Sequence, residues 1–66
     1  MNNKQTTIEW LNRKLDRNTK ELETWTGLST DNMTPEQKEI RDGKLKYYQG
    51  EVLYLKLNIE LLEGIE

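Results

Sequence analysis

The sequence predicts an all-α protein: an antiparallel two-helix hairpin that assembles into a helical bundle with other copies. Two long stretches place apolar residues at alternating steps of three and four, which is the spacing of one helix face. Each stretch opens with a threonine-based helix start signal and ends near a glycine. Between them, residues 26–34 are rich in Ser, Thr, Asp and Asn, a composition typical of a connector. With 66 residues, the chain has room for a single domain spanning residues 1–66.

The first predicted helix spans residues 7–25. Thr6, followed three residues later by Glu9, has the pattern of a capping box, in which each side chain accepts a hydrogen bond from the other residue's backbone N–H. Gly27 lies where a left-handed C-cap would end the helix. Residues 1–5 have no periodic pattern, so we expect them to be disordered.

The second predicted helix spans residues 35–63. Thr34 is its N-cap, Pro35 takes the first helical position, and Gln37 completes a capping box. Gly64 is the expected terminator. The pair Asp42-Gly43 is a turn signal that could break this helix, but one internal glycine costs only about 1 kcal/mol relative to alanine. The sequence therefore favours a continuous helix.

The second helix carries two apolar stripes, which lie about 160° apart around its axis. One is a seam that matches the first helix, whose own seam consists of Ile8, Leu11, Leu15, Asn18, Leu22 and Trp25. In antiparallel pairing these residues face, in the same order, Leu62, Ile59, Leu55, Val52, Tyr48 and Leu45. Asn18, the one polar member, either fixes the register or the oligomeric state, or reaches water at the edge of the seam. The other stripe has no counterpart on the first helix and consists of Tyr47, Gly50, Tyr54, Leu57 and Leu61.

This second stripe is the main sequence clue to function. It predicts that the chain associates with another chain, either a second copy in a homodimer or helical bundle, or one larger protein. A tyrosine-rich surface without a partner is the remaining interpretation. Glycines at Gly43, Gly50 and Gly64 fall on the same side, where a missing side chain lets a partner come close.

The first helix carries a second candidate surface, a basic stripe headed by an aromatic residue. Its members are Trp10, Arg13, Lys14, Arg17 and Lys20. Residues 1–20 hold five basic and two acidic residues, a balance of +3, whereas the remainder holds five basic and ten acidic residues, a balance of −5. The stripe could bind an acidic protein surface or an RNA backbone. Alternatively, it is a solvated face whose charges pair locally, Glu9 with Arg13 and Asp16 with Lys20.

Composition argues against several classes of function. The chain has no Cys and no His, and its Ser and Thr residues have no candidate base nearby, so the sequence predicts no enzyme activity, cofactor or metal site. No window approaches the eighteen apolar residues of a membrane span, and the segment MNNKQTT does not have the pattern of a signal peptide. We therefore expect a cytoplasmic protein that does not enter the membrane.

The predicted function is that of a non-enzymatic protein-binding module. A short, cysteine-free helical chain rich in Lys, Glu and Asn is typical of the small regulators or inhibitors that phages and other mobile elements encode, which cover a surface of a larger protein. In length and architecture alone the chain resembles the plasmid copy-control hairpin proteins. That resemblance implies an alternative, an RNA-binding hairpin dimer that uses the basic stripe. A purely structural oligomerisation role is the third hypothesis.

Overall fold

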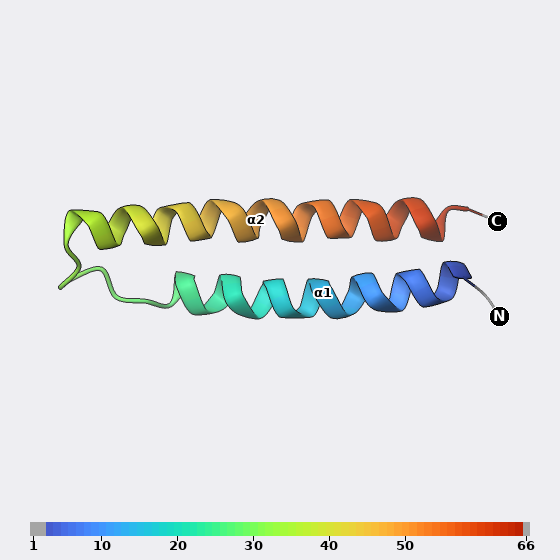
Figure 1. Cartoon of the computed structure of the whole chain (residues 1–66), viewed down its shortest axis with the longest axis horizontal. Helices are drawn as coiled ribbons and strands as arrows, with labels where there is room; N and C mark the ends of the chain where they lie inside the picture. The colour runs from blue at the N-terminus through green and yellow to red at the C-terminus, as the bar shows by residue number, and fades with distance from the viewer. Residues whose placement is uncertain (1–2, 66) are drawn as a thin grey trace.

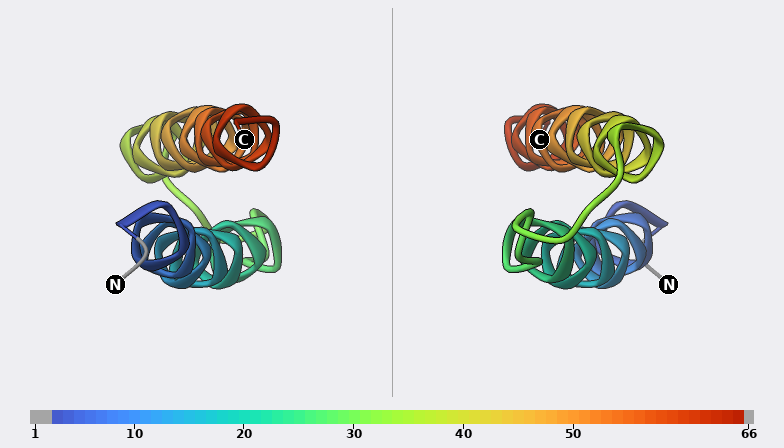
Figure 2. Two further views of the ribbon diagram at one scale, coloured as in Figure 1. Left: turned by 90° about the vertical axis from the view of Figure 1, so that its right-hand side faces the viewer. Right: turned by 90° about the vertical axis from the view of Figure 1, so that its left-hand side faces the viewer.

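Two long antiparallel helices joined by one connector make up the fold (Figure 1). The computed structural model of the chain describes residues 3–65. Helix α1 spans Asn3–Thr26 and helix α2 spans Pro35–Glu63, and the two lie side by side along their lengths (Figures 1 and 2). The predicted all-α antiparallel hairpin is confirmed.

Helix α1 begins earlier than the sequence pattern indicates. It starts at Asn3 rather than residue 7, and the Thr7 hydroxyl donates a 2.8 Å hydrogen bond to the Asn3 carbonyl across the first turn. Thr6 therefore lies inside the helix, and the prediction that it is the N-cap is wrong. Residues 3–5, predicted to be disordered, are helical, whereas residues 1–2 lie outside the described residues. A tertiary contact accompanies this earlier start: the Lys4 ammonium donates to the Ile65 carbonyl just beyond α2.

The end of α1 is stabilised by hydrogen bonds rather than by a left-handed glycine. Among residues 3–65 no glycine has a positive φ, so the left-handed C-cap predicted at Gly27 is wrong. The Gly27 N–H donates to the Glu23 carbonyl at 2.9 Å, and the Thr26 hydroxyl donates to the Leu22 carbonyl at 2.7 Å. These local bonds occupy carbonyls that a left-handed cap would otherwise satisfy.

Helix α2 has the predicted bounds and is continuous through Asp42-Gly43. Its capping box is present: the Gln37 N–H donates to the Thr34 hydroxyl oxygen at 3.2 Å, and the Thr34 N–H donates to the Gln37 side-chain oxygen at 3.0 Å. Pro35 occupies the first helical position, where its missing N–H leaves no intrahelical bond unmade.

We expect Thr34→Ala to lower the free energy of unfolding by about 1 kcal/mol, because it removes the acceptor for an orphan N–H at the start of α2. Urea titration followed by circular dichroism at 222 nm measures the change. Thr34→Ser keeps the hydroxyl and is the matched control. Equal stability of the alanine and serine variants would show that the cap contributes nothing.

The core is a thin seam between the two helices, with Ile8 and Leu11 of α1 packed against Leu55 and Ile59 of α2. Leu15 and Leu62 flank this cluster, as expected for a register that sets Ile8 opposite Leu62 and Leu15 opposite Leu55. Asn18 is half-buried and makes no side-chain hydrogen bond to any of residues 3–65, so it provides no polar lock on the register.

At the other end of the hairpin the seam becomes polar at Arg41. This side chain donates a 3.5 Å hydrogen bond to the Thr26 carbonyl and lies 3.5 Å from the Asp42 carboxylate. The last turn of α1 contains no basic residue, so Arg41 brings positive charge to the negative end of that helix dipole. The turns of α2 beyond α1 are thus tied to the hairpin by a charged contact.

The hairpin is a single layer of two helices, without a second layer on either side (Figure 2). The described chain measures 51 × 14 × 13 Å, and its radius of gyration of 15.5 Å exceeds the value of about 11 Å for a compact domain of this length. The side of α2 that faces away from α1 is therefore left uncovered.

Candidate interaction surface

The uncovered side of α2 carries a heptad pattern of its own. We call it the outer face. Its residues recur at alternating steps of three and four along the whole helix and its end: Ile40, Gly43, Tyr47, Gly50, Tyr54, Leu57, Leu61 and Gly64. Every one of them is exposed. The five residues of the predicted second stripe are all members, and the structure places them together.

Exposure separates the two sides of α2 sharply. Tyr54 is 64% exposed and Leu61 68%, whereas the neighbouring Leu55 on the seam is 3% exposed. Large side chains at half or more of their possible exposure, aligned on one face, are typical of a surface that another molecule covers. The outer face is therefore the main candidate interaction surface.

Two exposed apolar residues of α2 were not predicted from the sequence to belong to this surface. Ile40, 58% exposed, continues the outer face by one step of three before Gly43, and extending the heptad backward through Asp42-Gly43 would have found it. Leu53, 60% exposed, lies beside Tyr54 at the edge of the outer face. A wider arc of the helical wheel would have included it.

The two glycines inside α2 relieve no steric clash within the described residues of the hairpin. A Cβ atom added at Gly43 or Gly50 would meet nothing within 4 Å, and neither residue has a positive φ. By contrast, a Cβ at Gly27 would come within 3.3 Å of the Glu23 carbonyl oxygen. Since a glycine inside a helix costs about 1 kcal/mol relative to alanine, Gly43 and Gly50 lower the stability of the hairpin without relieving a clash.

Tyr47, in the aromatic part of the outer face, contacts a tyrosine of the seam. The ring centroids of Tyr47 and Tyr48 are 5.0 Å apart, and the rings are inclined at 78°, an edge-to-face contact. Tyr48 belongs to the half-buried seam, so this contact links the exposed Tyr47 ring to the seam side of α2. An ordered ring loses less conformational entropy when a partner covers it.

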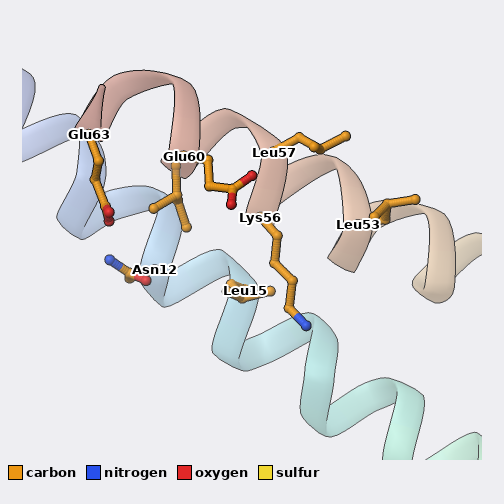
Figure 3. A pocket seen from close by; sticks show the side chains of 8 residues that line it. Asn12, Leu15, Leu53, Lys56, Leu57, Glu60 and Glu63 are labelled. Atoms are coloured by element: carbon orange, nitrogen blue, oxygen red, sulfur yellow. The ribbon is translucent and has the colours of Figure 1, made fainter. Parts of the chain in front are cut away.

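A shallow groove runs along one flank of α2, beside the outer face (Figure 3). It has a volume of about 410 Å³. Lys56 reaches toward α1 at its floor, whereas Leu53 and Leu57 point away from α1 along its rim (Figure 3). Leu57 belongs to the outer face and Leu53 lies at its edge, so the groove adjoins the outer face.

The basic stripe of α1 is also exposed. Trp10 is 55% exposed, and the Lys14 ammonium lies 4.6 Å from its ring centroid, a cation–π contact. The predicted local pairs Glu9–Arg13 and Asp16–Lys20 do not form ion pairs in the structure of residues 3–65. The charges of Arg13, Arg17 and Lys20 are thus available to a ligand, and Trp10 is partly covered by Lys14.

Within residues 3–65, no three acidic side chains gather into a group that could hold a metal ion. Neither α1 nor α2, as far as the structure describes them, is long and apolar enough to cross a membrane. Comparison with known proteins gives no match: no protein-family model, curated protein or solved structure is significantly similar to this chain. The two exposed surfaces themselves are therefore the observations that bear on function.

Proposed function

We propose that this chain is a non-enzymatic protein-binding module of the small-regulator type, which docks through the outer face of α2 and covers a surface of the protein it binds. The observation that supports the proposal is the unbroken heptad of exposed residues opposite the seam, from Ile40 to Gly64. A hairpin of two helices needs one such seam, and this chain has two.

The free energy of burying apolar side chains favours a covered outer face. Fully burying a large apolar side chain contributes about 1.5 to 3 kcal/mol, and the four large residues Tyr47, Tyr54, Leu57 and Leu61 are each half to two-thirds exposed. Covering them would contribute roughly 4 to 7 kcal/mol per chain before the entropy of association. That is comparable to the total of about 3 to 5 kcal/mol typical for a core of this size.

The proposal predicts that Tyr54→Asp and Leu57→Asp abolish binding to the partner without unfolding the hairpin, since both side chains are exposed in the free chain. A tagged chain carrying a photo-crosslinking amino acid at Tyr47 would be irradiated in its native cells, and the cross-linked chain identified by mass spectrometry. Gln49→Asp, which adds the same charge to an exposed position off the outer face, is the matched control. Cross-linking that survives Tyr54→Asp would place the binding surface elsewhere.

RNA binding is a second candidate, supported by the exposed and unpaired Arg13, Arg17 and Lys20 on α1. We expect Arg13→Glu combined with Arg17→Glu to abolish retention of single-stranded RNA. Replacing the two arginines by Gln should lower the slope of log K against log salt by about 1.4, at about 0.7 per phosphate contact. Lys38→Glu combined with Lys56→Glu makes an equal charge change on α2 and is the control. Retention that does not depend on salt would rule this function out.

A further inference from the structure

We infer that the partner of the outer face is a second copy of this chain, packed antiparallel so that residue n of one α2 lies beside residue 104 − n of the other. This inference rests on the proposed function and names the occupant of the proposed docking surface. A two-fold axis then crosses the pair of helices at the level of Val52. The surface that each copy presents is the same eight-residue face.

Side-chain size is self-complementary in this arrangement. In antiparallel helix pairs, the two seam positions of each heptad face each other, a against d. Ile40, Tyr47, Tyr54 and Leu61 are all large and occupy one of these positions, whereas the other holds Gly43, Gly50, Leu57 and Gly64. Large residues thus face mostly glycines.

The pairs that result account for the glycines. Tyr54 packs over Gly50 of the second copy, and Leu61 packs over Gly43 of the second copy. The two glycines whose Cβ position is empty in the hairpin are therefore the ones that large side chains need to approach. A tyrosine that lies over a glycine can bury its ring and keep its hydroxyl at the wet edge of the interface.

Overlap selects this register among the antiparallel alternatives. When the numbers of facing residues add up to 104, all eight positions of the outer face lie opposite another position of the outer face. A shift by one heptad in either direction leaves two of them beyond the end of the pair, Leu61 and Gly64 in one case and Ile40 and Gly43 in the other. The unshifted register buries the most apolar surface.

Flanking charge selects the same register. The flanking positions on one edge face each other two residues off the level of the seam pairs, so Lys46 lies near Glu60 of the second copy, and the two-fold symmetry forms this contact twice. The shift to seam sums of 97 instead places Glu39 near Glu60 of the second copy, which repels, and the attraction of Lys44 to Glu51 on the other edge only offsets that repulsion. Because a helical Cβ tilts toward its own N-terminus, Lys46 and Glu60 on this edge lean toward each other.

Leu53 provides an independent observation. This side chain is 60% exposed and belongs to neither seam, yet the register places it one residue from the level of the two-fold axis, near Leu53 of the second copy. On the opposite edge Glu51 meets Glu51 of the second copy, an unfavourable contact that the outward lean of both side chains weakens. Since the outer face and the seam lie about 160° apart, the dimer is a flat row of four helices with both α2 helices at its centre.

The first test exchanges the charges of Lys46 and Glu60. These residues are fourteen positions apart on one helix, about 21 Å, so they cannot interact within a chain. We expect Lys46→Glu and Glu60→Lys each to raise the dimer dissociation constant about ten-fold, and the double variant to restore it to within about three-fold. Glu51→Gln should tighten association about three-fold. Sedimentation equilibrium measures the constants, and circular dichroism confirms that each variant is folded.

The second test uses the absence of cysteine from the chain. Leu53→Cys should cross-link to a dimer in high yield with a short bismaleimide, because the two copies of this position lie near each other beside the axis. Tyr47→Cys should not cross-link, because the two copies of this position are offset along the helix axis by ten residues, about 15 Å. A parallel dimer would cross-link at Tyr47→Cys, which overturns the inference.

The molecular mass in solution distinguishes a failure of the dimer inference from a failure of the proposed function. A native chain that sediments at twice its 7.9 kDa mass, with restoration in the double charge variant, supports the inference. A chain that stays at 7.9 kDa at every concentration up to millimolar overturns it. In that case, cross-linking from Tyr47 to a different protein that Tyr54→Asp abolishes would leave the proposed function standing, and absence of any cross-link would end both.

Discussion

Leu55→Ala is expected to unfold most of the protein at 25 °C. Leu55 is the most buried side chain of the described residues, at 3% exposure, and packs in the middle of the Ile8, Leu11 and Ile59 cluster. Truncating a leucine at such a position costs about 2 to 5 kcal/mol. A core this small supplies only about 3 to 5 kcal/mol in total, so the loss is comparable to the whole stability of the hairpin.

The measurement is the helical signal at 222 nm and its urea dependence, recorded at concentrations below the dimer dissociation constant. Leu57→Ala, two residues away on the same helix and 50% exposed, is the matched control and should change the stability of the monomer by less than about 1 kcal/mol. Similar losses for both variants would contradict the assignment of the seam to Leu55 and of the outer face to Leu57.

Gly43→Ala combined with Gly50→Ala is expected to change two properties in opposite directions. The added methyl groups meet nothing within the hairpin, and each alanine favours the helix by about 1 kcal/mol, so the dilute monomer should gain about 2 kcal/mol. In the dimer, the same methyl groups enter the space of Leu61 and Tyr54 of the second copy, and we expect association to weaken at least about ten-fold.

Urea denaturation of the dilute chain and sedimentation equilibrium of the concentrated chain measure these two effects separately. Lys44→Ala, at an exposed position one residue after Gly43, controls for helix propensity outside the outer face. A double variant that stabilises the monomer and leaves association unchanged would show that the glycines are not there for a close approach.

If the outer faces are joined in a dimer, the basic stripes of the two α1 helices remain accessible. They lie on the outermost helices of the flat row, with Trp10 and Lys14 stacked at one end of each stripe. A larger partner with an acidic surface, or an RNA backbone, would then meet two equivalent basic surfaces. A target that binds the basic stripes does not compete with the dimer, whereas a target that binds the outer face does.

The candidate surface was largely predictable, because a heptad repeat is visible in the order of residues. Tyr47, Tyr54, Leu57 and Leu61 were identified from spacing alone, and the structure finds each of them exposed. Ile40 was not predicted as a member of this surface, because the Asp42-Gly43 turn signal interrupts the heptad pattern just after it. What spacing could not reveal is that the Cβ positions of Gly43 and Gly50 are empty, since that depends on the distance to every other part of the chain.

The sequence by itself determined the two helices, their antiparallel register, the start of α2 at Thr34 and the division of α2 into two faces. These features follow from local chemistry, because capping groups and apolar spacing act within a few turns of one helix. Only the tertiary structure decided that α1 begins at Asn3 and that Arg41 serves the far end of α1. Each of these places carries a contact between residues far apart in the chain, Lys4 with Ile65 and Arg41 with Thr26, and such contacts have no periodic signature in the sequence.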